Sequence, residues 1–363
     1  MTNEYKGELM KESLLNLLNG NEKSVTIVDI YLRGGVEKEI IDGRLDIDGK
    51  SYQIKKGVPV FYTSPNYNDD QVKTNDTFSA KWNVFMRENN EASFDYMFRF
   101  VLKRLVPLGI NNEAQFKDFL ADKRMILDAG SGMGWMSEYM AQNTSGTVIS
   151  AEIGDGVFAG YEKCQKYSNC HVIKADLMNL PFPDNTFDYI HSDGVLHHTP
   201  DTKLAMKALY DKVHPGGVFW FYIYKEMNPV KHFCDDYIRK QFSELSPEQA
   251  LEQCKAITEL GRELQRINAS ITIERPIELL NIPAGTYDLQ RFIYYNFIKC
   301  FWNDQIGYDM SNIVNFDWYH PNNAQQQTEQ EVRTWMKEYG IDDYDIYIAN
   351  PNGMNVVIRK SKC

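Results

Sequence analysis

Residues 125–136 read M-I-L-D-A-G-S-G-M-G-W-M, and the architecture can be predicted outward from them. The apolar run at 125–127 suits a short buried parallel strand, and Gly130, Gly132 and Gly134 follow it directly. The residues after these glycines have helical periodicity. Glycine lets the chain turn tightly and lets a ligand reach the main chain without a Cβ in the way. The helix N-terminus beyond supplies unpaired N–H groups. We therefore expect a strand, a ligand-binding loop and a helix.

Two kinds of ligand use such a loop, and the spacing of its residues separates them. A dinucleotide fingerprint G-x-G-x-x-G from Gly130 would place its third glycine at Trp135, where a bulky ring prevents close helix–sheet packing. An NAD site is therefore disfavoured. The pattern D-x-G-x-G-x-G from Asp128 resembles motif I of the class I S-adenosylmethionine (SAM) methyltransferases. The resemblance implies that Asp128 serves the cationic methionine part of SAM. A tight turn in another α/β fold is the alternative.

The composition limits the class of protein. A chain of 363 residues exceeds the usual size of one domain, which predicts a core domain with additions. The net charge of -11 argues against a large non-specific surface for nucleic acid. The six cysteines include no C-x-x-C pair, so neither a metal site nor a disulfide framework is expected. The polar N-terminus and the lack of a long apolar run predict a cytoplasmic protein without membrane insertion.

The N-terminal region is predicted to form a small β-rich module. Residues 8–19 predict an amphipathic helix. Short β-prone runs between residues 25 and 62 predict a small antiparallel sheet, with Asp-Gly hairpin signals at 42–43 and 48–49. Residues 48–61 resemble the end of the zinc-ribbon partner domain found beside some tRNA and release-factor methyltransferases, although the cysteines are missing. The resemblance implies a packing or substrate-gating module, and a plain structural extension is the alternative.

An aromatic segment precedes the glycine loop. Residues 63–76, rich in Ser, Pro, Asn and Asp, predict a linker. Phe78, Trp82 and Phe85 follow it. Similar segments precede motif I in a set of bacterial and archaeal SAM methyltransferases, where they lie over the cofactor entrance. Ordinary helix packing is the alternative, because these spacings also suit a helical core face.

After motif I the chain alternates strand and helix, which predicts a doubly wound parallel sheet. The second strand, 147–151, ends in Glu152, and an ionised carboxylate there can accept hydrogen bonds from both hydroxyls of a ribose. The third strand, 171–174, is followed by Asp176 and Leu177. This pair resembles the family segment in which an acid and the next backbone amide bind the adenine edge. A surface Asp that caps the next turn is the alternative.

Residues 180–201 read L-P-F-P-D-N-T-F-D-Y-I-H-S-D-G-V-L-H-H-T-P-D. They resemble the fourth motif of the methyltransferase type 11 group, which includes ubiquinone and menaquinone biosynthesis enzymes. The resemblance places Ser192 and Asp193 in the cofactor site, at the carboxyl end of the fourth strand. His197 and His198 follow, between a strand end and a predicted helix start. A histidine there can act as a general base, and a structural role beside the cofactor is the alternative.

The C-terminal part is predicted to complete the sheet. A P-G-G turn leads into a fifth strand at 218–224, and residues 343–349 and 354–359 predict a hairpin. Methyltransferases of this class end their sheet with such an antiparallel pair. The resemblance therefore implies an α/β fold with a doubly wound, seven-stranded, Rossmann-like sheet.

Residues 226–328 are too many for a loop in a compact domain, and they predict a helical substrate lid. Its helices are expected at 229–241, 247–267 and 287–302. The run N-F-D-W-Y-H-P at 315–321 resembles the segment before the last helix in the same bacterial and archaeal set. Asp317, Tyr319 and His320 are candidate substrate contacts, and an ordinary loop anchor is the alternative.

Together these features predict a SAM-dependent methyltransferase acting on a small molecule. The predicted domains are 1–76, the 77–225 core, the 226–328 lid and the 329–363 C-terminal segment. The predicted cofactor-binding residues are Asp128, Gly130, Gly132, Gly134, Glu152, Asp176, Leu177, Ser192 and Asp193. The predicted catalytic residues are His197, His198, Tyr319 and His320. A tRNA-modifying methyltransferase and a non-catalytic SAM-binding protein are the alternatives. The acceptor, the methylated atom and the oligomeric state are not predicted.

Overall fold

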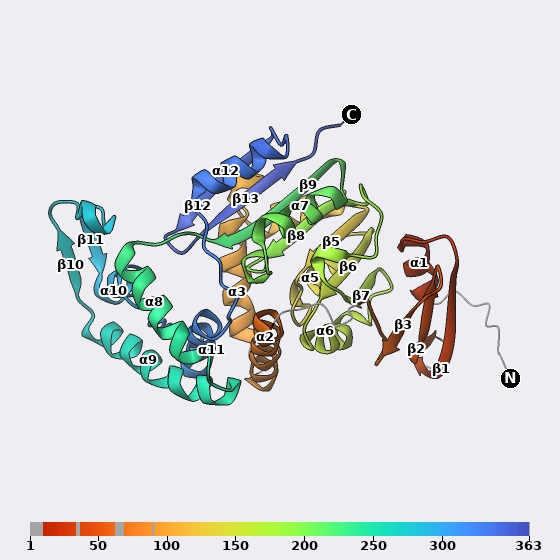
Figure 1. Cartoon of the computed structure of the whole chain (residues 1–363), viewed down its shortest axis with the longest axis horizontal. Coiled ribbons are helices and arrows are strands. Elements are labelled where there is room, and N and C mark those ends of the chain that lie inside the picture. Colours follow the sequence, from red (N-terminus) through yellow and green to blue (C-terminus); the bar gives the residue numbers. More distant parts are fainter. Residues whose placement is uncertain (1–9, 34–36, 62–68, 89–90, 363) are drawn as a thin grey trace.

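The computed structural model describes residues 10–33, 37–61, 69–88 and 91–362. Within them, an eleven-stranded sheet has the order β1-β2-β3-β4-β7-β6-β5-β8-β9-β13-β12. A helical insertion lies at one end of the molecule and the N-terminal strands lie at the other (Figure 1). No helix of the described part is both long and apolar enough to cross a bilayer.

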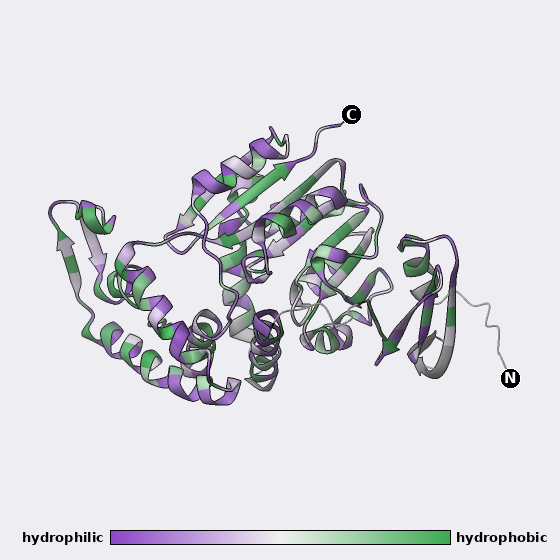
Figure 2. Ribbon diagram, in the orientation of Figure 1, coloured by the Kyte–Doolittle hydropathy of each residue, from purple (hydrophilic) through white to green (hydrophobic). Residues whose placement is uncertain are grey.

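Five neighbouring parallel strands form the centre of the sheet. They are β5 (Met125–Ala129), β6 (Thr147–Glu152), β7 (Cys170–Lys174), β8 (Phe187–Asp193) and β9 (Val213–Tyr224). Their sequences are nearly continuous apolar runs, because helices cover both faces of the sheet. Ile126 packs in one core and Leu127 in the other, since successive side chains of a strand point to opposite faces. Burying each such side chain contributes about 1.5–3 kcal/mol. Figure 2 shows the hydrophobic residues gathered along these strands.

Helices from distant parts of the sequence cover the two faces. One core receives side chains of α1 (Met10–Leu17), α7 (Thr202–Lys212) and α12 (Glu329–Glu338). The other receives side chains of α3 (Glu91–Arg104), α4 (Glu113–Ala121), α5 (Trp135–Asn143) and α6 (Gly156–Cys164). The doubly wound α/β architecture that the sequence predicts is therefore present.

The C-terminal hairpin follows the central strands. β12 (Tyr344–Asn350) and β13 (Gly353–Arg359) pair with each other, and β13 pairs antiparallel with β9. The order β7-β6-β5-β8-β9-β13-β12 contains the seven strands expected from the sequence. They are, however, part of a larger sheet.

The N-terminal strands pair antiparallel, as expected, and they extend the central sheet rather than form a sheet of their own. They are β1 (Lys23–Arg33), β2 (Glu37–Ile47), β3 (Lys50–Lys55) and β4 (Val58–Val60). β4 pairs in parallel with β7 through Val60 and Lys174. Asp48 and Gly49 both have positive φ, as a two-residue hairpin turn requires. The other Asp-Gly signal, at 42–43, lies inside β2 at a register irregularity, so that hairpin was misplaced.

The α-helices α2, α3 and α4 lie in the chain between this region and the first central strand. α2 (Asp69–Glu88) begins inside the segment expected to be a linker, so residues 69–76 are helical. Residues 62–68 of that segment lie outside the described residues. α2 also carries the aromatic segment, and α3 follows it.

The insertion contains more structure than the sequence indicated. Its elements are α8 (Pro229–Phe242), α9 (Pro247–Ile267), β10 (Ser270–Ile273), β11 (Gly285–Asp288), α10 (Leu289–Asn296) and α11 (Gly307–Tyr319). α10 is shorter than expected, and the β10–β11 hairpin and α11 were not predicted. α11 packs against α2 and α9 and is buried on most of its circumference, so it lacks the polar face that marks an amphipathic helix.

Candidate active site

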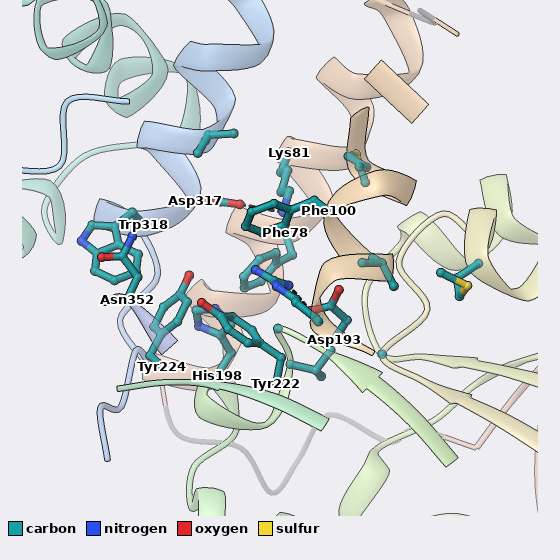
Figure 3. A pocket seen from close by; sticks show the side chains of 18 of the residues that line it. Phe78, Lys81, Phe100, Asp193, His198, Tyr222, Tyr224, Asp317, Trp318 and Asn352 are labelled. Atoms are coloured by element: carbon teal, nitrogen blue, oxygen red, sulfur yellow. Dashed lines mark hydrogen bonds and ion pairs between the residues drawn. The ribbon is translucent and has the colours of Figure 1, made fainter. Parts of the chain in front are cut away.

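A cavity of about 1080 Å³ lies at the carboxyl ends of the central strands, between the sheet and helices α2, α3, α10 and α11. Ligands of open α/β sheets bind at this edge. We call one part of the cavity the loop end; it is lined by Asp128, Gly130, Glu152, Asp176 and Leu177. We call the other part the insertion end; it is lined by Tyr224, Lys299, Asp317, Trp318 and Asn352. Figure 3 shows several of these side chains around the cavity.

The first two glycines of the motif hold the loop at the sheet edge. Gly130 has φ +80° and lines the cavity, and Gly132 has φ +57°. Such values disfavour any side chain with a Cβ. A Cβ on Gly132 would lie 2.5 Å from the ring of Trp82 on α2. The indole of Trp82 therefore lies directly against this part of the loop.

Gly134, the third glycine, has a packing role. A Cβ there would lie 2.9 Å from Cα of Gly160, where α5 meets α6. Of the three glycines, only Gly130 lines the cavity; Gly132 and Gly134 do not. The loop is therefore shaped by three glycines, but for different reasons.

Glu152 presents its carboxylate at the end of β6. Its two oxygens accept hydrogen bonds from the backbone N–H groups of Gly132 (2.9 Å) and Gly154 (2.7 Å). These bonds fix the carboxylate at the cavity wall. Each carboxylate oxygen has a second acceptor position, so the group can still accept the two hydroxyls of a ribose.

Asp128 is a buried carboxyl group at the end of β5. The hydroxyl of Ser137 donates to its Oδ2 over 2.5 Å. Burial raises its pKa to about 7; the Ser137 hydrogen bond lowers the pKa and the charges of Glu152 and Asp193 raise it. A buried carboxylate without a cation is costly. The position therefore suits a ligand that brings a positive charge, as the methionine part of SAM does.

Asp176 and Leu177 line the cavity beside Glu152. The carboxylate of Asp176 accepts hydrogen bonds from Met178 N (2.9 Å) and Asn179 Nδ2 (2.7 Å). Asp176 thus caps the turn that follows, as the alternative interpretation held, and still lies at the cavity wall. Its capping bonds fix its place beside the ligand space.

Ser192 and Asp193 were both predicted to lie in the cofactor site, but they have different positions. Ser192 is buried outside the cavity lining, and its hydroxyl donates to Ala129 O over 3.0 Å, which ties β8 to β5. Asp193 lines the cavity and forms an ion pair with Arg104 of α3. The Arg104 guanidinium also lies 3.6 Å from the ring centre of Tyr222.

The two adjacent histidines also differ. His197 is fully buried outside the cavity lining, its Nδ1 accepts from Tyr224 N over 3.3 Å, and burial lowers its pKa. His198 lines the cavity and donates from Nδ1 to Asn323 O over 2.6 Å. Burial lowers the pKa of His198 to about 4. His198 is therefore neutral at pH 7, with Nε2 as its acceptor atom, and is a weak base.

Tyr319 and His320 do not line the cavity, although both were expected to contact substrate. The Tyr319 hydroxyl donates to Lys299 O over 3.1 Å. His320 Nε2 donates to Leu245 O over 3.2 Å, and its Nδ1 lies 2.6 Å from Thr77 Oγ1 on α2. Both side chains are buried. Their positions correspond to the structural anchor that was the alternative.

The neighbours of these two residues do reach the cavity. Asp317 forms a 2.7 Å ion pair with Lys81 of α2, and this pair is drawn in Figure 3. Trp318 lines the cavity beside Tyr224, with ring centres 4.4 Å apart. Asp317 was among the candidate contacts, but Lys81 and Trp318 were not singled out.

Other cavity residues were missed altogether. Tyr222 and Tyr224 occupy alternate positions of β9, and this period-two pattern was available as a signal. Arg104 is the last residue of α3, and Lys299 lies between α10 and α11. No local pattern distinguishes either residue from a surface cation.

Comparisons with known proteins agree on the central region. Residues 127–221 match a family model described as a methyltransferase domain. A demethylmenaquinone methyltransferase from Staphylococcus haemolyticus is 34% identical over 79 residues, which are 22% of this chain and 33% of that protein. A sterol 24-C-methyltransferase from Aspergillus fumigatus is 28% identical over 104 residues, 27% of this chain and 27% of that protein. The chain thus matches about a third or less of these relatives' lengths.

One solved structure in the same comparisons is a SAM-dependent methyltransferase from Aquifex aeolicus. Its TM-score to this chain is 0.36 at 14% sequence identity, covering 68% of this chain and 88% of that one.

Proposed function

Because residues 127–221 are a SAM-dependent methyltransferase domain of the class I α/β fold, we propose that the chain transfers the methyl group of SAM to a small-molecule acceptor. One observation carries the proposal: the loop end and the insertion end belong to the same cavity. A cofactor held at the loop end would therefore share its space with whatever binds under the insertion. SAM supplies a methyl group activated by its sulfonium charge.

The loop end would hold SAM through three acidic side chains. Glu152 has acceptor positions for the ribose hydroxyls, and Asp176 with Leu177 lies beside it for the adenine. Asp128 and Gly130 would face the charged methionine part. The pKa of the buried Asp128 is about 7, so the carboxyl is only partly ionised at neutral pH, and a cationic ligand would complete its ionisation; the residues present therefore fit this group.

The insertion end would hold the acceptor. Residues 226–328 act as the lid in this proposal, and α11 together with α2 closes over the sheet. Aromatic rings of Phe78, Tyr224 and Trp318 would exclude water and orient the acceptor. His198 contributes a neutral hydrogen-bond acceptor, rather than a strong base, because its pKa is about 4. Positioning and desolvation are therefore the main contributions of this chain to the rate.

Ligand binding and methyl transfer test the proposal separately. Calorimetry of the full chain should show binding of SAM and of its demethylated product, and no binding of NADH. Binding of NADH without SAM would refute the cofactor assignment. Incubation of a cell extract with methyl-labelled SAM should then label small molecules in the presence of the protein.

The fate of the label distinguishes the alternatives. Label in tRNA would show that the acceptor is a nucleic acid and not a small molecule. The net charge of -11 argues against this outcome, because nucleic-acid binding relies on cationic side chains. No label in any fraction, with SAM binding intact, would favour a non-catalytic SAM-binding protein. Gly130→Val is the matched negative variant, because its side chain would collide with Val195 and enter the cavity wall.

A further inference from the structure

Lys299 is a buried lysine at the insertion end of the cavity. Only 5% of its surface is exposed, and its Nζ lies 4.0 Å from the ring centre of Trp318. Among the described residues, Nζ has neither a carboxylate within ion-pair distance nor a hydrogen-bond acceptor. Lysine is rarely buried unless it is paired. A group from outside the chain is therefore the natural partner of this amine.

The carboxylates nearest to Lys299 are already engaged. Asp235 accepts two hydrogen bonds from Lys231 Nζ (3.0 and 3.1 Å) and one from the Trp318 indole (2.9 Å). Asp317 is held by Lys81 at 2.7 Å. Neither acid is free to turn to Lys299 without breaking one of these pairs.

The cluster around Trp318 therefore has surplus positive charge. Arg239 donates from Nε to Trp318 O over 3.1 Å, and its buried Nη2 has no partner. Four cationic side chains, those of Lys81, Lys231, Arg239 and Lys299, meet two carboxylates, so two positive charges remain when Lys299 is protonated. In a chain of net charge -11, a positive cluster at a cavity wall favours an anion there.

The charge of Lys299 depends on what occupies the cavity. Burial lowers the pKa of Lys299 to about 7; Asp317 and Asp235 raise this pKa, and Lys231 and Arg239 lower it. The other groups nearby, His197 and Cys254, remain uncharged at pH 7, because burial lowers the pKa of His197 and raises that of Cys254. A bound anion would thus hold Lys299 in its protonated form.

Aromatic rings determine the shape of the ligand space next to this lysine. Trp318 lies against Lys299 and Tyr224 packs on Trp318. Phe78, Phe100 and Tyr222 line the same cavity, and Figure 3 shows these rings facing it. Flat rings pack well against such walls by stacked or edge-on contacts. We propose that the acceptor is a flat conjugated ring bearing an ionised oxygen group, and that Lys299 binds this group as an ammonium. The inference rests on the proposed function, since it assigns the acceptor end of the same cavity.

Two probes of equal shape test the inference. 2-Naphthoate and 2-naphthamide differ in the ionised oxygen group, and each is titrated into the full chain saturated with the demethylated cofactor. Naphthoate should bind at least about tenfold more tightly than naphthamide. At pH 8, where Lys299 is mostly neutral, naphthoate binding should also take up about one proton, measured by calorimetry in buffers of different ionisation enthalpy.

Variants assign the effect to Lys299. Lys299→Gln should remove both the preference for naphthoate and the proton uptake. Lys299→Arg should keep the preference without proton uptake, because arginine is always charged. Lys255→Gln is the matched control, since Lys255 is an exposed lysine of α9 paired with Glu252. Melting temperatures of all variants check that each one is folded.

The outcomes separate this inference from the proposed function. Equal binding of the two probes, binding of neither, or an unchanged preference in Lys299→Gln overturns the assignment of Lys299. Failure of the demethylated cofactor to bind in the first titration refutes the proposed function instead.

Discussion

Asp128 leads to a prediction in which pH controls cofactor affinity. Its pKa is about 7 in the free protein because of burial. A cationic ligand favours the ionised form, so binding lowers this pKa and releases a proton. SAM affinity should therefore fall as pH falls below about 7, since the free protein is then protonated at Asp128. From pH 7.5 to pH 6 the expected loss is about eightfold, or about 1.3 kcal/mol, for full ionisation in the complex.

Calorimetry at pH 6, 6.5, 7 and 7.5 measures both the SAM affinity and the number of protons released on binding. Wild type should show the fall in affinity and release close to one proton at pH 6. Asp128→Asn should give a flat profile without proton release. Lys299 also titrates near pH 7, so Lys299→Gln is the necessary control and should keep the slope. A flat wild-type profile, or an unchanged slope in Asp128→Asn, would refute the role given to Asp128.

Two further changes test other parts of the site. Glu152→Ala should weaken SAM and its demethylated product alike by about 1.5–3 kcal/mol in calorimetry, the scale of hydrogen bonds to a charged group; unchanged affinity would exclude Glu152 as the ribose acceptor. His320→Ala should lower the melting temperature, through a loss of about 1–3 kcal/mol from unsatisfied buried groups, while SAM affinity stays within about twofold. If His320→Ala instead lost methyl transfer without losing stability, His320 would be a contact of the acceptor.

The sequence was sufficient to predict the central strands because their signals are local. The apolar run at 125–127, the three glycines and the acidic strand end at Glu152 are read within a few residues, and the structure has β5, its loop and β6 there. The N-terminal strands, in contrast, are connected to the central strands by the pairing of β4 with β7. This pairing joins Val60 and Lys174, which are far apart in the chain. No local pattern encodes such a contact.

The insertion end shows why only some of the predicted residues reach the cavity. No helix was predicted for the run at 315–321, so its side-chain directions were undefined, but α11 continues to Tyr319. Consecutive residues of an α-helix are about 100° apart, so Asp317 and Tyr319 point in nearly opposite directions. Asp317 faces the cavity, and Tyr319 therefore lies in the core. Lys299 was missed because its burial and its lack of a partner exist only in the folded chain.

Asp128 and Lys299 together predict how turnover depends on pH. The pKa of each group is about 7, but cofactor binding needs Asp128 ionised and acceptor binding needs Lys299 protonated. Acid removes the first condition and alkali removes the second, so the free protein is most competent near pH 7, with about a quarter of the molecules in the doubly charged form. The ratio kcat/KM for the acceptor identified by isotope transfer, measured at SAM concentrations below its Kd, should give a bell-shaped profile. Asp128→Asn should abolish its acid limb, and Lys299→Gln its alkaline limb. If both limbs of the profile survive in both variants, neither Asp128 nor Lys299 controls binding. The acidic loop end would then not select the cofactor by charge, and the cationic insertion end would not select the acceptor by charge.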